Sequence, residues 1–555
     1  MTHKSFMGRH SKAVAKSLSL LLALFVVNVL LLAPQWLLVG GWESGWFALE
    51  SACVVGLFTI VPRTRWSMHL ASVTATALVL VSMIGLADTV ARQSLGRPLN
   101  LYLDLTLVSA VYRLLSGVLG LGLGILILVG IVVSTCLATW LIASLLSSVR
   151  PSNLKQLPSP VAVAVAVAVI TLSIFALTRG TAYSFEQHIA WPAVRTVSDQ
   201  ARHGLRMLTE QRVFSAEVNA VPSDYANVPG LLDRLRERDV LLAFVESYGV
   251  SAIDDPRYSS VLRPRLDDLT RRIADAQLSL ATGRLLAPTQ GGQSWFSHLS
   301  LVSGLWVDNQ LRYDLLLASG RETLIDDFHR AGHRTVALMP ANTLAWPEGE
   351  RLGYDEILAR RDISYAGPPL NWVTMPDQFT WSFLENNVRV SDRDQRPLFA
   401  ELGLISSHAP WTPILPVLDN WDSIGDGEIF ETWRDAGERP QDLWRDHERV
   451  RKHFALSLDY AINVIIGYAE RYVDEQTLLI VLGDHQPAPL ITGDDASRAV
   501  PVHVISGDPT LIEPFLHWGF ATGALPDTTR PALGMDAFRD WFVRAFSTLI
   551  DKSDS

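Results

Sequence analysis

The sequence predicts two parts: an N-terminal α-helical transmembrane bundle of about five spans, and a C-terminal α/β domain whose mainly parallel sheet is sandwiched by helices. Long apolar stretches fill residues 1–180, whereas short apolar runs alternate with amphipathic stretches over residues 239–555. Charge divides in the same way. Residues 1–180 hold 12 Lys and Arg against 4 Asp and Glu, a net charge of +8, and the remaining residues hold 35 against 53, a net charge of −18.

Five segments have the length and apolarity of membrane spans, because a helix needs about 20 residues to cross the hydrocarbon. They are residues 17–39, 45–62, 69–90, 118–147 and 159–178. The first is too long for a cleaved signal peptide, and no small-residue cleavage site follows it. Both cysteines, Cys53 and Cys136, lie in these segments, so we expect no disulfide framework in the soluble part.

Lys and Arg orient the spans, because they are enriched in cytoplasmic loops. Basic residues precede the first span, separate the second from the third, and separate the fourth from the fifth: Lys4, Arg9, Lys12, Lys16, Arg63, Arg65, Arg150 and Lys155. An odd number of spans then places everything after residue 180 outside the cytoplasm. The loop at 91–117 departs from this pattern, because it is expected outside and yet carries three arginines.

Three acidic residues, Glu50, Asp88 and Asp104, lie within or near the ends of the predicted spans. They either line a lipid head-group pocket or are solvated at helix ends, and we favour solvation because acids inside a membrane are rare. Residues 181–238 mix aromatic, aliphatic and charged side chains. This segment is interpreted as an amphipathic bridge on the membrane surface, with a plain linker helix as an equal alternative.

The soluble part has the pattern of strands alternating with helices. Strands are predicted at 239–247, 334–340, 397–406, 477–484 and 501–506, and helices at 263–276, 321–332 and 442–473. In such a parallel sheet the ligand site lies beyond the carboxyl ends of the strands. The acidic balance of this part argues against nucleic-acid binding through a basic surface.

Polar residues with catalytic chemistry stand at these strand ends. Glu246 ends the first strand, His408 ends another, and Asp484 and His485 end a fourth. Ser294 follows a glycine pair and begins an apolar helix, where free backbone N–H groups favour a bound phosphate. Two carboxylates and an imidazole suit a divalent metal ion such as Zn, Mn or Mg, which would activate the Ser294 hydroxyl as a nucleophile.

The motifs VESYG, TQGGQS, SSHAPW and LGDHQP, in this order, give the sequence a resemblance to a known superfamily. The chain resembles the alkaline phosphatase/sulfatase superfamily, in particular the lipoteichoic acid synthase and lipid A phosphoethanolamine transferase branch. The resemblance covers nearly the whole chain. It implies a five-span membrane domain in a bacterial inner membrane and an extracytoplasmic, periplasmic catalytic domain.

The resemblance also implies a role for each matching residue. Glu246, Asp484 and His485 match the metal ligands, and Ser294 matches the nucleophile, which is usually threonine in those transferases. His408 matches a histidine that binds the substrate phosphate or protonates the leaving group. The stretch 332–356 resembles the approach to the active site, where the candidate substrate contacts are Trp346 and Arg351.

Other assignments stay open or are disfavoured by the sequence. Thr289 is a rival nucleophile, but it precedes the glycines and does not begin the helix. His503 is either a second metal ligand or a core residue, and His298 is more often structural at such a position. A formylglycine sulfatase needs Pro and Arg after its nucleophile, whereas Ser294 is followed by Trp295, Phe296, Ser297 and His298, so a sulfate ester is a disfavoured substrate.

These observations favour a phosphotransferase that moves a phosphoglycerol or phosphoethanolamine head group from a membrane phospholipid to a glycan or lipid acceptor. The reaction would pass through a phospho-Ser294 intermediate. Two alternatives remain open: a phosphodiesterase or phosphatase of the same superfamily, with water as the acceptor, and a non-catalytic membrane scaffold or sensor that keeps the fold.

Overall fold

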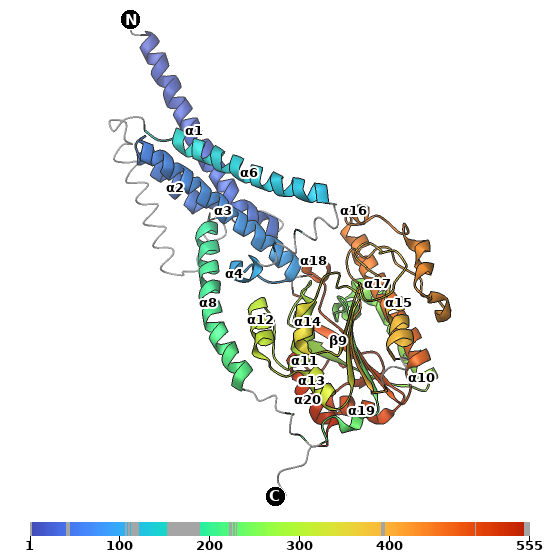
Figure 1. The fold of residues 1–555 in the computed structure, drawn as a ribbon. Helices are drawn as coiled ribbons and strands as arrows, with labels where there is room; N and C mark the ends of the chain where they lie inside the picture. The colour runs from blue at the N-terminus through green and yellow to red at the C-terminus, as the bar shows by residue number, and fades with distance from the viewer. Residues whose placement is uncertain are drawn as a thin grey trace. The chain divides into compact units, whose positions relative to one another are not determined.

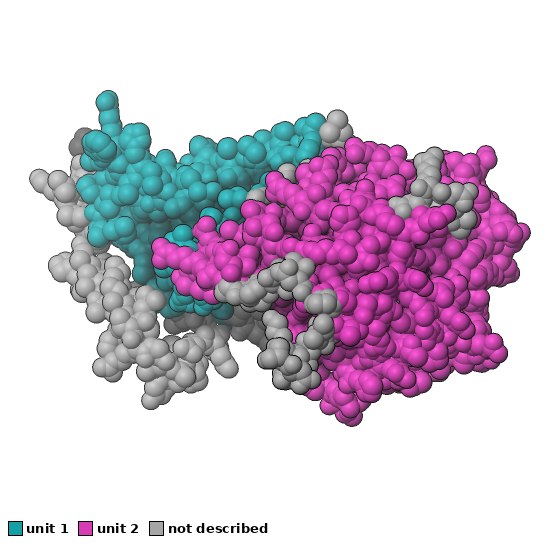
Figure 2. All heavy atoms as spheres, turned by 60° about the horizontal axis from the view of Figure 1, so that its bottom comes forward, with its two compact units in different colours: residues 1–93, 97–208 teal, residues 94–96, 209–555 magenta. Residues whose placement is uncertain are grey.

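The computed structural model describes residues 3–39, 45–105, 108, 112, 121–151, 189–220, 225, 228, 230–389, 395–493 and 495–548. The chain divides into two compact units, which Figure 2 shows in different colours. Unit 1 consists of residues 1–93 and 97–208, and unit 2 of residues 94–96 and 209–555.

Unit 1 is helical. Its longest helices are α1 (His3–Val39), α3 (Arg65–Leu95), α6 (Leu121–Ser148) and α8 (Pro192–Ala220), the last of which continues into unit 2. Three segments within the described residues are long and apolar enough to cross a membrane: Ser17–Leu37, Arg65–Leu95 and Gly122–Ser148. They agree with the first, third and fourth predicted spans, so the chain is a membrane protein.

The second and fifth predicted spans are not among these three segments. The second forms the 12-residue helix α2 (Leu49–Ile60), which at 1.5 Å per residue is only about 18 Å long. Pro62 explains why this helix stops, because a proline disfavours helical geometry in the residue before it, and Val61 is extended. The predicted span at 159–178 lies outside the described residues.

The three acids near the predicted span ends have protein partners within unit 1. Glu50 Oε1 accepts hydrogen bonds from the backbone N–H groups of Ala193 and Val194, so it caps the first turn of α8. Asp88 pairs with Arg92 at 2.8 Å and Asp104 pairs with Arg97 at 2.7 Å. Asp88 also lines a cavity of about 340 Å³ in this unit.

Unit 2 is built on one mixed sheet with the strand order β10-β4-β9-β8-β3-β7-β5-β6, and β11 pairs with β4. Strands β8, β3, β7, β5 and β6 are mutually parallel, whereas β9 is antiparallel to both β8 and β4. The bounds are β3 Asp239–Val245, β4 Ser279–Leu286, β5 Arg334–Met339, β6 Glu356–Ala359, β7 Leu398–Gly403, β8 Thr477–Gly483, β9 Ala499–Ser506, β10 Ala521–Thr522 and β11 Leu533–Gly534. The predicted mainly parallel sheet is therefore confirmed at its centre.

Side-chain alternation along β3 explains why helices cover both faces of this sheet. Leu241, Ala243 and Val245 pack into one core, whereas Leu242 and Phe244 pack into another. The first core also contains apolar residues of α10 (Pro256–Asp275), α15 (Asp377–Phe383) and α17 (His447–Tyr472). The second contains those of α11 (Ser294–Ser303), α13 (Leu324–Arg330), α19 (Pro509–Trp518) and α20 (Phe538–Phe546), and Figure 1 shows the two layers.

Candidate active site

Parallel pairing of β3 with β8 brings two acidic residues to the same edge of the sheet. The last residues of these strands, Val245 and Gly483, are partners in the register. Because both strands run in the same direction, the residues that follow them leave the sheet side by side. Glu246 and Asp484 are those residues, so a local rule of strand pairing brings together carboxylates from distant parts of the sequence.

Glu246, Asp484 and His485 form a compact cluster in which one ligand atom of each lies within 4.8 Å of the others. His485 Nε2 is 3.5 Å from Glu246 Oε1 and 3.6 Å from Asp484 Oδ2. The imidazole is oriented by its other nitrogen, because Nδ1 donates to the carbonyl oxygen of Gln486 at 2.8 Å. Asp484 Oδ1 accepts from the backbone N–H groups of Ser247 and His485, so Oδ2 faces the cluster.

The electrostatics of the cluster favour an added positive charge. Burial raises the pKa of Asp484 to about 6, and the charge of Glu246 acts in the same direction. Burial also acts to raise the pKa of Glu246, but the imidazoles of His485 and His408, together with side-chain hydrogen bonds, outweigh it and lower that pKa. For His485, burial favours the neutral ring, yet the two carboxylates raise its pKa.

A divalent metal ion fits this cluster. His485 Nε2 is buried and has no hydrogen-bond partner among the described residues. A buried polar atom without a partner is costly, and here it faces two carboxylates that repel each other. Two carboxylate oxygens and an imidazole nitrogen are ligands that Zn, Mn or Mg accepts, so a cation would satisfy all three groups.

Ser294 lies at this cluster, as the first residue of α11. Its hydroxyl is close enough to Asp484 to help lower the pKa of that carboxyl, against the larger effect of burial. The approach to the helix requires left-handed backbone geometry at Gly291 (φ 73°) and Gln293 (φ 65°), which explains the glycine before the serine. The rival Thr289 instead closes the preceding turn, since its hydroxyl donates to the Gly292 carbonyl oxygen at 2.7 Å.

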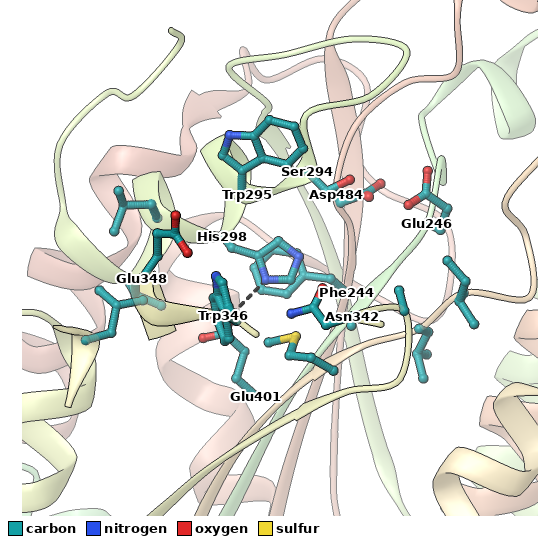
Figure 3. A pocket seen from close by; sticks show the side chains of 18 of the residues that line it. Phe244, Glu246, Ser294, Trp295, His298, Asn342, Trp346, Glu348, Glu401 and Asp484 are labelled. Carbon is teal, nitrogen blue, oxygen red and sulfur yellow. Dashed lines mark hydrogen bonds and ion pairs between the residues drawn. The ribbon is translucent and has the colours of Figure 1, made fainter. Parts of the chain in front are cut away.

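His408 faces the same cavity, which has a volume of about 470 Å³ and is also lined by Glu246, Ser294 and Asp484. Its Nδ1 donates to the carbonyl oxygen of Ala409 at 2.5 Å. Nε2 is then the ring nitrogen that can bind a ligand or exchange a proton with it. Figure 3 shows Ser294, Asp484 and Glu246 along one side of this cavity.

The structure places the three remaining candidates, Trp346, Arg351 and His503, in different surroundings. Trp346 lines the cavity, whereas Arg351 is exposed and is not among the residues that line it. His503 is buried in β9, where its Nε2 bonds the hydroxyl of Tyr248 at 3.0 Å and its Nδ1 bonds that of Thr282 at 2.9 Å. Burial lowers the pKa of His503 to about 4, and both ring nitrogens are already engaged, so it is a core residue rather than part of the cluster.

One part of the cavity was not expected from the sequence. Glu401, in β7, has only 1% of its surface exposed, and its two carboxylate oxygens receive separate donors. Oε1 lies 2.7 Å from Nδ1 of His298, and Oε2 accepts the Tyr354 hydroxyl at 2.6 Å. The only signal in the sequence is a glutamate inside an apolar strand, which nothing local connects to a histidine on α11.

Residues 296–498 match the sulfatase family. The matched region contains His408, Asp484 and His485, and it begins two residues after Ser294. Over this region the match confirms the predicted resemblance to sulfatase-like enzymes. No curated protein matches the chain.

Solved structures of low sequence identity are also similar to this chain. The lipoteichoic acid synthase LtaP from Listeria monocytogenes is 11% identical, with 59% of this chain and 81% of that one covered and a TM-score of 0.34. The phosphoglycerol transferase GacH from Streptococcus pyogenes is 12% identical, with 63% and 87% covered and a TM-score of 0.35. The C-terminal periplasmic domain of EcEptC from Escherichia coli is 12% identical, with 55% and 93% covered and a TM-score of 0.32.

Proposed function

We propose that the chain, which contains a sulfatase-like region at residues 296–498, is a membrane-anchored, metal-dependent phosphotransferase of the alkaline phosphatase superfamily. It takes the head group of a membrane phospholipid, phosphoglycerol or phosphoethanolamine, and transfers it to a glycan or lipid acceptor. The protein is a multi-pass component of a bacterial inner membrane, with unit 2 in the periplasm. The observation that carries this proposal is the contact of the Ser294 hydroxyl with Asp484 in the cluster of Glu246 and His485.

The metal ion would have two tasks in this proposal. Held by Glu246, Ser294, Asp484 and His485, it would neutralise charge on the phosphoryl group and lower the pKa of the Ser294 hydroxyl. The free backbone N–H groups at the start of α11 stabilise a phosphoryl oxygen beside it.

The residues of the chain then divide the transfer into two steps. In the first, Ser294 Oγ, which has lost its proton to solvent, bonds to phosphorus, the ester bond to diacylglycerol breaks, and His408 Nε2 gives a proton to the leaving oxygen. In the second, the acceptor oxygen bonds to phosphorus, its proton passes to His408 and the bond to Ser294 breaks. The membrane anchor supports a lipid donor, because it keeps the site beside a bilayer.

Turnover of labelled phospholipid tests the proposal. The full chain, reconstituted in liposomes with a divalent metal, should release diacylglycerol and place the labelled head group on an added acceptor. Ser294→Ala should lower this rate by a factor on the order of 10³, while Ser294→Thr, which keeps a hydroxyl, should retain activity. Full activity in Ser294→Ala would refute the mechanism, and release of only the free head group would favour hydrolysis.

A further inference from the structure

The cavity extends well beyond the metal cluster. Away from Glu246, Ser294 and Asp484 it is lined by a group of residues that we call the distal arm, which consists of His298, Tyr313, Trp346 and Glu348. Figure 3 shows Glu348 and Glu246 on opposite sides of the view, with His298 and Trp346 between them. A ligand whose phosphoryl group lies at the cluster would therefore extend its substituent toward these residues.

His298 offers a hydrogen-bond acceptor to this space. Its Nδ1 is 2.7 Å from the buried carboxylate of Glu401, and an ionised carboxylate can only accept, so Nδ1 carries the hydrogen of this bond. In the neutral ring Nε2 then carries a lone pair. The ring is held in place from its face as well, because it stacks on Phe244 with centroids 3.7 Å apart.

Glu348 adds a carboxylate that lacks a partner. It is half-buried on α14 (Pro347–Leu352), and no described residue forms a hydrogen bond or ion pair with it. None of the described residues that line the cavity is Lys or Arg. Burial raises the pKa of Tyr313, and the charge of Glu348 raises it further. The negative charge of Glu348 is therefore felt at the Tyr313 side chain, inside the distal arm.

Aromatic rings complete the distal arm. Trp346 precedes α14, and the side chains of Trp346 and Tyr313 both line the cavity together with Glu348. Aromatic faces attract cations through their quadrupole, and the attraction grows when the site excludes water. An unpartnered carboxylate, an imidazole lone pair and aromatic faces together suit a group that is positively charged and donates hydrogen bonds.

We propose that the distal arm binds an ammonium group attached to the transferred phosphate, so that the donor is a zwitterionic, amine-bearing phospholipid. This inference rests on the proposed function and selects one of its two head groups. The phosphate lies at the metal cluster and the ammonium group at Glu348, so opposite charges of the ligand meet opposite charges of the cavity. A glycerol head group has hydroxyls but no charge to compensate Glu348, and it leaves that carboxylate partly buried without a counterion.

Binding measured without turnover tests the inference separately from the reaction. Calorimetry on the full-length Ser294→Ala protein in detergent with Mn²⁺ would compare O-phosphoethanolamine with glycerol phosphate. We expect O-phosphoethanolamine to bind about tenfold more tightly, as one charge-assisted contact implies. Glu348→Gln should remove this preference, and Glu350→Gln, an exposed neighbour on the same helix, should keep it.

Equal binding of the two compounds, or an equal loss for both in Glu348→Gln, would overturn the inference. The reaction has its own readout, which is diacylglycerol release by the wild-type protein from liposomes of phosphatidylethanolamine or phosphatidylglycerol. Preferred binding of O-phosphoethanolamine without any release would uphold the distal arm and refute the transferase. Faster release from phosphatidylglycerol would support the transferase and refute the ammonium site.

Discussion

His485 Nε2 lies 3.5 Å from Glu246 Oε1, although the two residues follow different strands of the sheet. The distance is longer than a hydrogen bond and leaves both atoms directed at a common point near Asp484. A carboxylate and an imidazole held in this way are preorganised for a cation, so that little rearrangement is needed when one binds.

Replacing Glu246 with Gln should therefore weaken metal binding by at least about tenfold, because the change removes a charged ligand but keeps the side-chain shape. Competition titration and metal analysis of the purified chain would measure the affinity and stoichiometry. Glu428→Gln, on an exposed site, is the matched control. An unchanged metal content in Glu246→Gln after dialysis would show that the cluster does not hold the ion.

The pH dependence of stability should reveal Asp377, which stands behind the loop that leads to His408. Its Oδ1 accepts from the backbone N–H groups of Ile405 and Ser406 at 2.8 and 2.9 Å, and burial raises its pKa from 3.8 to about 6. Between pH 3.8 and about 6, Asp377 holds a proton in the folded chain that it has lost in the unfolded chain. The contribution of Asp377 to the free energy of unfolding is thus largest on the acid side. It falls as the pH rises from about 4 to about 6, by about 3 kcal/mol in all.

Asp377→Asn removes this titrating group, so its thermal unfolding midpoint should fall less than that of the wild type between pH 4.5 and 6.5. Both proteins should be measured without metal, so that Asp484 contributes equally to each. Parallel curves for the two proteins would contradict the assignment.

The sequence was sufficient to predict the residues that end apolar parallel strands. Glu246 and Asp484 interrupt runs of buried residues, and the rule that parallel strands share a carboxyl edge then brings them together. The eight-residue strand β4 was not predicted. β4 contains Gly283 and Arg284, which break its apolar pattern, and the place of that glycine is explained only by the Phe520 ring packed against it.

The distal arm shows why part of the cavity could not be predicted. Glu401 and His298 are 103 positions apart and belong to a strand and a helix whose spacing carries no local pattern. A lone glutamate in an apolar strand is compatible with a solvent-facing edge, and a histidine one turn into a helix is compatible with packing. Only the packing of α11 against the sheet makes them partners.

Glu401→Ala should lower the free energy of unfolding by about 2–3 kcal/mol, because it leaves His298 Nδ1 and the Tyr354 hydroxyl without their acceptor in a buried site. Tyr354→Phe removes only one of these hydrogen bonds and should cost about 1 kcal/mol. Chemical unfolding monitored by tryptophan fluorescence would measure both. Equal stability of the three proteins would mean that the network contributes nothing to the fold.

The last prediction concerns the backbone that positions Asp484. A Cβ atom at Gly483 would lie 1.8 Å from the carbonyl oxygen of Tyr248, and backbone cannot move aside as a flexible side chain can. Gly483→Ala should therefore separate the end of β8 from the turn after β3 and displace Asp484 from Glu246. We expect metal affinity to fall by at least about tenfold, since displaced ligands cannot share one ion. Gly204→Ala, at a helical site with nothing within 4 Å, should leave that affinity unchanged. Normal metal binding by Gly483→Ala would show that the close approach of the two chain segments does not set the geometry of the cluster.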